Sequence, residues 1–347
     1  MILSKIQDSP NVNWFAFGKR CSSAFPDVIK TFMGRDALGL YLWNMKREEE
    51  VKTALIPAYT CNEVIDQFRK HGFEILFYDM CDFHLDIDVL MRSLRNHKID
   101  VFYFIHYFGI VQSNMGQILK ALKQFSPAMH IVEDRAHYLS NRLLYPEVDA
   151  IIYSFRKLMP IPEGGGVLAS RKLEYCYRPS WHSNLLALAM PMKKVLFGHN
   201  PKFSRSKMLK GESILTNEVL PPSVFSKKIV DSFDVVKQTD LRRRLFVLWI
   251  DKLSLTSIMP VYDALKPDDI PQGCPIYVAD AEVVQREMDE KGIYLKRHWP
   301  IDPEYKLSAS GAYALSERVI TLPIYEGIEE KDMEGILQML QQVGGVA

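Results

Sequence analysis

Short apolar runs alternate with amphipathic segments through the first half of the chain. The runs hold four to six residues each and lie at Thr53–Pro57, Glu74–Tyr78, Val101–His106, His130–Glu133 and Ala150–Ser154. The segments between them, at about 61–70, 86–95 and 113–125, place apolar residues at helical spacing. Strands that are apolar throughout are buried on both faces, so this alternation predicts right-handed βαβ units and a mostly parallel sheet.

The pattern changes on either side of this region. Residues 35–47 place apolar side chains at helical spacing after Gly34, which predicts a helix that begins at a loop. Beyond residue 170 the alternation stops, and residues 171–255 are predicted to be mostly helical, with one long helix from about 222 to 254. The end of the chain predicts a strand near Ile276–Ala279, a helix over 281–290, a strand at Arg318–Leu322 and a last helix over 329–342.

These segments predict three parts for a chain of 347 residues. Residues 1–170 form a large α/β domain, 171–256 a helical bridge, and 257–347 a small C-terminal α+β domain. At roughly 150 residues per domain, the length agrees with about two domains. The basic step Arg242–Arg244 in the long predicted helix is interpreted as a solvated helix face.

Composition narrows the class of protein. Lys plus Arg is 43 and Asp plus Glu is 42, so a net charge of +1 gives no electrostatic reason to expect a nucleic acid or an anionic membrane as partner. The five cysteines are widely spaced without a Cys-x-x-Cys pair, which is typical of reduced thiols. Lys5 and Asp8 place charges within the first apolar residues of the sequence, so no signal peptide is expected. No apolar run reaches roughly 18 residues, so no membrane span is expected. We expect a cytoplasmic protein.

Candidate chemistry lies at the strand ends, because ligands of an open parallel sheet bind beyond the carboxyl ends of its strands. Asp134 follows a buried strand, where a carboxylate is costly unless a cation pairs with it. The protonated ring nitrogen of pyridoxal phosphate (PLP) is one such cation, and PLP enzymes combine such an acid with a Schiff-base lysine. For Asp134 alone, a helix N-cap is an equally good interpretation.

Lys157 follows the next strand and precedes the glycine-rich turn Glu163–Gly166. A lysine can condense with an aldehyde once burial or neighbouring cations lower the pKa of its amine. A surface lysine is the alternative for Lys157 alone, but its pairing with Asp134 at consecutive strand ends favours a functional site.

Two further features fit the same cofactor. Gly34 and Arg35 stand at a predicted helix start, where backbone N–H groups and a guanidinium suit a phosphate. His137 could reach the phenolic oxygen of PLP, although such a histidine is more often a buried residue with a satisfied partner. Ser154-Phe-Arg-Lys157 also matches the S-x-x-K motif of penicillin-recognising enzymes, but the S-D-N and K-T-G partners of that motif do not occur, and no G-x-G-x-x-G follows a strand.

Six segments, in order, resemble the DegT/DnrJ/EryC1/StrS family of PLP-dependent sugar aminotransferases, a branch of fold type I. The segments resemble its phosphate-binding turn, proline-aromatic-threonine segment, His-aromatic-x-Gly strand end, acidic motif, serine–lysine–glycine region and small-domain strand. They are Met33–Leu38, Ile56–Cys61, His106–Gly109, Val132–His137, Ser154–Gly165 and Arg318–Tyr325. The resemblance implies the PLP-dependent transferase fold of type I, with a large sheet flanked by helices and a smaller C-terminal α+β domain.

The resemblance also implies roles for single residues. Lys157 carries PLP and moves the proton during transfer, Asp134 keeps the pyridine nitrogen protonated, and His137 neighbours the phenolic oxygen. Ser154 and the turn at Gly34–Arg35 hold the phosphate. Asp36 and Tyr59 belong to the matching segments and are also counted as cofactor-binding residues.

The activity implied is amino transfer from glutamate to a nucleotide-linked keto-sugar, for cell-surface polysaccharide or secondary-metabolite synthesis. Lysine at position 157 favours this activity, because the family's dehydratase branch has histidine there. Members of the family are homodimers with the active site at the interface.

Two of the chain's departures from the family pattern concern the expected site. Only Phe155 and Arg156 separate Ser154 from Lys157, fewer residues than usual, and Cys61 stands where an aromatic residue often stacks on the PLP ring. Tyr59 or Phe108 are the candidates to replace that aromatic. These departures leave two alternatives open, a PLP-binding relative without turnover that serves as a regulatory or scaffold dimer, and a PLP dehydratase or lyase.

Overall fold

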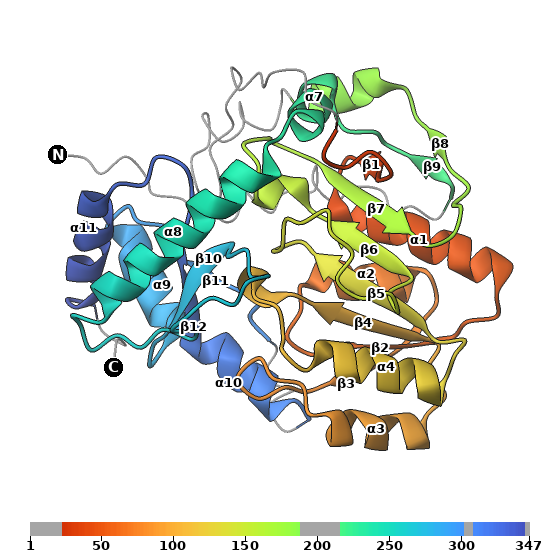
Figure 1. Ribbon diagram of the computed structural model, residues 1–347, viewed down its shortest axis with the longest axis horizontal. Helices are drawn as coiled ribbons and strands as arrows, with labels where there is room; N and C mark the ends of the chain where they lie inside the picture. The colour runs from red at the N-terminus through yellow and green to blue at the C-terminus, as the bar shows by residue number, and fades with distance from the viewer. Residues whose placement is uncertain (1–22, 188–215, 302–307, 344–347) are drawn as a thin grey trace.

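A seven-stranded sheet organises the first half of the protein in the computed structural model, which describes residues 23–187, 216–301 and 308–343 (Figure 1). The strand order is β1-β7-β6-β5-β4-β2-β3. The strands are β1 Ile29–Thr31, β2 Thr53–Pro57, β3 Glu74–Tyr78, β4 Val101–Ile105, β5 His130–Arg135, β6 Ala150–Tyr153 and β7 Gly165–Ala169. The pairs from β3 to β6 are parallel, whereas β7 runs antiparallel to both β6 and β1. The predicted mostly parallel α/β sheet is therefore confirmed.

The predicted strands and the observed strands agree because each is a short run of mostly apolar residues, and all but the edge strand β3 are largely buried. Every residue of β4 and β6 is buried, and apolar runs of this kind mark strands covered on both faces. β2 and β3 have the predicted bounds, and the other three differ by one or two residues. β1 was not predicted, since three residues are too few to show a pattern.

The helices that connect the strands run in two directions along the sheet. The helices are α1 Gly34–Glu48, α2 Asn62–Lys70, α3 Ile87–Asn96 and α4 Met115–Phe125. α2 leads outward from β2 to β3, while α3 and α4 lead back from β3 to β4 and on to β5. Right-handed crossovers in opposite directions place α2 and the pair α3, α4 on opposite faces. The direction changes between β2 and β4, and this is the point where such sheets bind ligands.

The predicted long helix over 222–254 is wrong, because two helices occupy this stretch. α7 spans Val224–Asp231 and α8 spans Val235–Leu253. The side chain of Asp234 accepts a hydrogen bond from Lys237 N at 2.9 Å, which caps a new helix start and ends the continuity. The preceding stretch holds short strands, β8 Cys176–Tyr177 and β9 Glu218–Val219, which pair in parallel. Residues 188–215 of the predicted helical bridge lie outside the described residues.

The interpretation of Arg242–Arg244 as a solvated helix face is wrong for Arg242, which lies on α8. The Arg242 side chain is only 2% exposed, and its Nη2 donates to the carbonyl oxygen of Leu158 at 3.0 Å. Its Nη1 lies 3.4 Å from the carbonyl oxygens of Pro271, Gln272 and Ile324. The guanidinium is buried because α8 crosses between the large sheet and the C-terminal part, where carbonyl groups need donors.

A second, smaller sheet forms the C-terminal part. β10 Gly273–Tyr277, β12 Val319–Pro323 and β11 Lys296–Arg297 pair antiparallel in the order β10-β12-β11. α8, α9 Ala281–Glu290 and α11 Glu330–Leu340 gather around this sheet (Figure 1). α9 has the predicted bounds, β10 begins three residues earlier than predicted, and α10 Ser310–Arg318 was not predicted. In the described residues no helix is both long and apolar enough to cross a membrane.

Candidate active site

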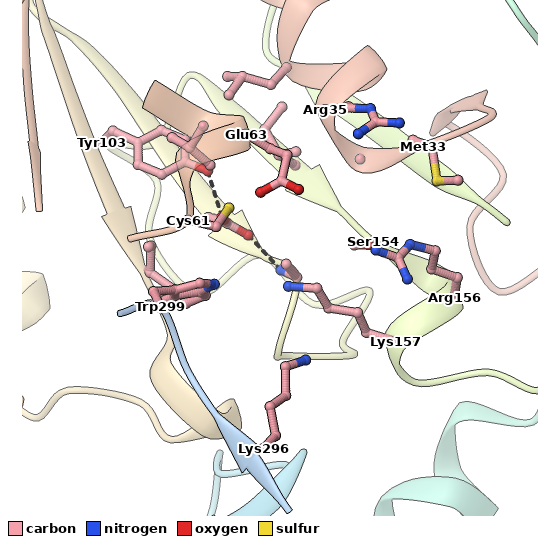
Figure 2. A pocket seen from close by; sticks show the side chains of 17 residues that line it. Met33, Arg35, Cys61, Glu63, Tyr103, Ser154, Arg156, Lys157, Lys296 and Trp299 are labelled. Atoms are coloured by element: carbon pink, nitrogen blue, oxygen red, sulfur yellow. Dashed lines mark hydrogen bonds between the residues drawn. The ribbon is translucent and has the colours of Figure 1, made fainter. Parts of the chain in front are cut away.

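A cavity of about 280 Å³ opens at the carboxyl ends of β2, β4, β5 and β6, across the point where the direction of the connections changes (Figure 2). Both parts of the protein line it. The large sheet and its helices contribute Met33, Gly34, Arg35, Leu38, Cys61, Glu63, Val64, Tyr103, Ile105, Asp134, Ala136, Ile152, Ser154, Arg156 and Lys157. The small sheet and the loop after β11 contribute Lys296 and Trp299.

Successive side chains of β5 point to opposite faces of the sheet, which separates the polar residues at the end of this strand into two sets. Asp134 faces the cavity, whereas its neighbours Glu133 and Arg135 point to the opposite face of the sheet. There Arg135 Nε donates to Glu133 Oε1 at 2.6 Å, and His106 Nε2 lies 2.9 Å from the same oxygen. All three side chains are fully buried. His106, Glu133 and Arg135 thus form a buried ionic cluster away from the cavity.

Two donors fix the carboxylate of Asp134. Tyr103 Oη donates to Oδ2 at 2.5 Å, and the backbone N–H of Ala136 donates to Oδ1 at 2.6 Å. Burial raises the pKa of Asp134, and the nearby amine of Lys157 opposes that rise. No helix follows this residue, so the N-cap interpretation of Asp134 is wrong.

Lys157 ends a 3-10 turn, Phe155–Lys157, that follows β6 directly. Its amine points into the cavity (Figure 2), so the surface-lysine alternative is wrong. Burial first, and Lys296 second, lower the pKa of Lys157 to about 8. An amine with this pKa is unprotonated in about a tenth of the molecules at pH 7, far more than an ordinary lysine, which suits a nucleophile or a general base.

The opposite end of the cavity is built for an anion. A Cβ added to Gly34, the first residue of α1, would lie 2.9 Å from the carbonyl oxygen of Tyr153 and 3.2 Å from Ser154 Cβ. A Cβ on Gly165 would lie 2.2 Å from the Met33 carbonyl carbon. Only glycine at these two positions allows the first turn of α1 to approach Ser154 and the turn at Gly165 this closely. Backbone N–H groups, a hydroxyl and the nearby Arg35 suit a phosphate.

Three of the predicted cofactor-binding residues lie outside the lining of this cavity. The carboxylate of Asp36 accepts a hydrogen bond from Met33 N at 2.9 Å and closes the start of α1. Burial raises the pKa of Asp36 to about 6. Tyr59 is buried in an aromatic cluster, with its ring centroid 5.3 Å from that of Trp299. His137 lies behind the cavity wall, with Nε2 at 3.3 Å from Lys157 Nζ.

The aromatic residue of the small part that reaches the cavity is Trp299. Its indole ring is stacked on the imidazole of His137, with an interplanar angle of 9° and ring centroids 5.2 Å apart. Its φ of 44° lies in the left-handed region, which is strained for a bulky residue and is held here by packing. Neither Tyr59 nor Phe108 lines the cavity, whereas Trp299 does.

Sequence reasoning missed Glu63, Tyr103, Arg156, Lys296 and Trp299 as lining residues. Glu63 stands in the first turn of α2, two positions beyond a segment that the family resemblance covers. Lys296 and Trp299 approach from more than 100 residues away along the chain, and no local pattern shows such a contact.

The fold is the α/β architecture of the PLP-dependent transferases of fold type I. A putative sugar aminotransferase from Streptococcus pneumoniae, Spr1654, solved in its PLP form, has 18% identity and a TM-score of 0.66 over 92% of this chain and 88% of that chain. Helicobacter pylori PseC, an aminotransferase in pseudoaminic acid biosynthesis, has 14% identity and a TM-score of 0.64 over 91% and 86%. A DegT/DnrJ/EryC1/StrS aminotransferase from Brucella abortus has 16% identity and a TM-score of 0.61 over 91% and 85%.

These identities are low, so the likeness concerns the fold. No family model matches the sequence, and no curated protein sequence matches it. The predicted fold class is confirmed, and the solved structures belong to the class of enzymes that the sequence resembles.

Proposed function

We propose that the protein is a PLP-dependent aminotransferase that moves an amino group from glutamate to a nucleotide-linked keto-sugar. One observation carries the proposal, namely that Lys157, Asp134 and the Gly34–Ser154 anion site face a single cavity. An amine, a carboxylate and an anion site are the partners for the aldehyde, the ring nitrogen and the phosphate of PLP.

The residues of the cavity fit this cofactor. Lys157 would hold the aldehyde carbon, Asp134 the ring nitrogen, and Gly34, Arg35 and Ser154 the phosphate. The buried carboxylate of Asp134 has a raised pKa, so a cationic N–H beside it would compensate the cost of its burial. When bound, PLP supplies a carbonyl that captures amines and a protonated ring that accepts electrons from the substrate carbon.

The residues of the chain would do the rest. Nζ of Lys157 would take the proton from the donor's α-carbon and deliver it to the carbon of the cofactor that bears the amino group, since its pKa of about 8 suits both steps. Asp134, held by Tyr103 and Ala136, would keep the ring nitrogen protonated. Trp299, from the small part, would cover the reacting groups and limit the access of water.

The comparisons support the choice of a sugar as acceptor. Spr1654 is described as a putative sugar aminotransferase, PseC serves pseudoaminic acid biosynthesis, and DesI was solved with its TDP-sugar product. Glutamate as donor, a homodimer with the active site at the interface, a cytoplasmic location and a role in cell-surface polysaccharide or secondary-metabolite synthesis follow from the family resemblance and belong to this proposal.

The test uses the purified full-length chain with PLP. We expect visible absorbance from lysine-bound cofactor, loss of that absorbance with L-glutamate, and its return with a nucleotide-linked keto-sugar. Reduction with borohydride followed by peptide mapping should place the label on Lys157. Lys157→Ala should lose the absorbance and keep the fold, while Lys331→Gln, a change at an exposed lysine in the same chain, should behave like the wild type.

A label on another lysine, or a protein that takes up no PLP, would overturn the proposal. Bound cofactor with no response to any amino donor would support the alternative of a binding protein without turnover. Release of water from a sugar, without amino transfer, would support the dehydratase.

A further inference from the structure

A carboxylate enters the cavity from α2. Glu63 stands in the first turn of this helix, its side chain lines the cavity, and the residue is exposed. Figure 2 shows its carboxylate pointing into the cavity from the side of Cys61, whereas Lys157 enters from another side. Burial raises the pKa of the Cys61 thiol to about 11, and the charge of Glu63 adds to that rise, so the carboxylate lies near this side chain.

Glu63 has no hydrogen bond and no ion pair within the described part of the chain. Four cations line the same cavity, namely Arg35, Arg156, Lys157 and Lys296. None of these four forms an ion pair with Glu63. Asp134, the other carboxylate of the described lining, already accepts two hydrogen bonds. Because an ionised carboxylate only accepts hydrogen bonds, Glu63 is ready to accept one from a group of the ligand.

An acid in the first turn of a helix also stabilises the helix dipole, and this is the simplest role for Glu63. Asp88, in the first turn of α3, has only that role, since it is exposed and does not line the cavity. Glu63 differs because its side chain lines the cavity beside Cys61. A cysteine is smaller than the aromatic residue that often stands at position 61 in the family that the sequence resembles, which leaves room for a ligand beside the carboxylate.

We infer that Glu63 accepts a hydrogen bond from a hydroxyl of the keto-sugar, on a ring carbon next to the carbon that receives the amino group. This inference rests on the proposed function. In keto-sugars a ring carbon beside the reacting carbon commonly carries a hydroxyl, so the acceptor for that hydroxyl must share the cavity with Lys157 and approach from a different side. Glu63 meets both conditions, and hydrogen bonds to a charged group are the stronger ones. The residue thereby selects sugars with a hydroxyl beside the keto group over deoxygenated ones.

The exposure of Glu63 sets the size of this selectivity. When the hydroxyl is missing, water can solvate the carboxylate, so no buried group is left without a partner. The selectivity is therefore about 10-fold, well below the roughly 10⁴-fold of a closed site that hydrogen-bonds a substrate hydroxyl.

The test uses small ring amines in place of the aminated sugar, so the nucleotide need not be known. Cyclohexylamine is compared with each stereoisomer of 2-aminocyclohexanol, which carries one hydroxyl beside the amine. On the PLP-loaded protein, each amine takes the aldehyde carbon of the cofactor from Nζ of Lys157, and Nζ leaves as a free amine. Borohydride then labels Lys157 only where no exchange has occurred, so the mass of its peptide gives the amine concentration for half-exchange.

The measured quantity is the half-exchange concentration of cyclohexylamine divided by that of the amino alcohol, taken within each protein. For at least one stereoisomer we expect this ratio to fall about 10-fold in Glu63→Ala. Glu63→Gln retains an uncharged acceptor and should give an intermediate ratio. Asp88→Ala removes an acid from the first turn of α3, outside the cavity, and should keep the wild-type ratio.

A further probe distinguishes a hydroxyl from a cation as the partner of Glu63. 1,2-Diaminocyclohexane carries an ammonium in place of the hydroxyl. If the ratio depends on Glu63 for the diamine alone, the assignment to a hydroxyl is overturned.

The two proposals fail in different ways. If every stereoisomer of the amino alcohol gives the same ratio in the wild type and in Glu63→Ala, the role of Glu63 is wrong, while lysine-bound PLP that responds to glutamate leaves the aminotransferase proposal standing. A wild type that takes up no PLP overturns both. Melting temperatures of Glu63→Ala, Glu63→Gln and Asp88→Ala, compared with the wild type, exclude unfolding as the cause.

Discussion

Nζ of Lys157 lies 3.3 Å from Nε2 of His137, on the wall of the cavity. The backbone N–H of Phe108 donates to Nδ1 of the same ring at 3.4 Å, so the neutral imidazole carries its hydrogen on Nε2. Burial lowers the pKa of His137 well below its usual value, and Lys157 lowers it further. Nε2–H therefore faces the amine as a donor, and it can donate only to an unprotonated amine. His137 stabilises the neutral form of Lys157.

This relationship predicts a shift in the pH dependence of cofactor capture. His137→Phe removes the donor, so the pKa of Lys157 should rise and the midpoint of PLP uptake against pH should move up by about one unit. His137→Gln retains an N–H donor and should move the midpoint less. Stopped-flow absorbance between pH 6 and 10 measures both. Equal midpoints in the wild type and His137→Phe would contradict the role of His137.

The lowered pKa of Lys157 predicts a dependence of stability on pH in the cofactor-free protein. The folded-state pKa is about 8, below the 10.5 of an ordinary lysine. Between these values the unfolded state binds more protons, so the free energy of unfolding rises with pH in this window. The contribution is on the order of 3 kcal/mol. Below pH 8 both states are protonated and the unfavourable burial of the charge is fully present.

Lys157→Met should lack this rise. Urea unfolding of the two proteins at pH 7.5 and pH 10, without PLP, isolates the contribution as the difference between wild type and variant. Parallel stability profiles would show that the amine is solvated in the folded protein.

The carboxylate of Asp134 should be essential to cofactor function. Asp134→Asn keeps an oxygen that accepts from Ala136 N and an NH2 group that can donate to Tyr103 Oη, but it removes the charge that would keep the ring nitrogen protonated. We expect amino transfer to fall by at least about 100-fold while the melting temperature of the cofactor-free protein does not fall, because a buried carboxylate is replaced by a neutral group.

Tyr103→Phe is a milder change at the same carboxylate. It removes one of two hydrogen bonds, which should raise the pKa of Asp134 and slow transfer about 10-fold. The loss should be larger at low pH, where more of Asp134 is protonated. A pH–rate profile of both variants beside the wild type checks this, and an unchanged profile would show that Tyr103 acts only in packing.

Arg242 should matter for both stability and the site. Arg242→Met removes the donors to the Leu158 carbonyl and to three further carbonyl oxygens, which leaves buried acceptors without partners. We expect a loss of about 1–3 kcal/mol in the free energy of unfolding. Weaker PLP binding should accompany it, because Leu158 follows the reacting lysine. Denaturant unfolding and PLP titration measure the two effects.

Arg244→Met, two residues further along α8, is the matched control. Arg244 is exposed, so its loss should change stability by no more than about 0.5 kcal/mol. A loss as large in Arg244→Met as in Arg242→Met would show that the effect belongs to the helix and not to the buried contacts.

Much of the large sheet could be predicted because its strands are short, mostly apolar runs, which are visible in the sequence. The bounds of β2 and β3 agreed with their apolar runs, and the cavity brings together Asp134 and Lys157, which were chosen only for their places at strand ends. The break between α7 and α8 was not predicted, because Phe233 continues the apolar pattern while Asp234 begins a new helix. Which of the polar residues at the end of β5 would face the cavity could not be decided without the register of the strand, which turns Asp134 to the cavity and Glu133 away from it.

The sequence by itself determined which segments must be buried and which polar residues stand at the ends of strands, since both are local properties of the chain. Only the tertiary structure decided what those residues meet. Lys296 reaches the cavity from a strand of two residues and Trp299 from the loop that follows it, and Arg242 is buried because two parts of the chain close over it. The physical reason is that the spacing of apolar residues shows which face of a helix or strand is buried. It does not show which residues pack against that face, because those contacts join segments that are far apart in the chain.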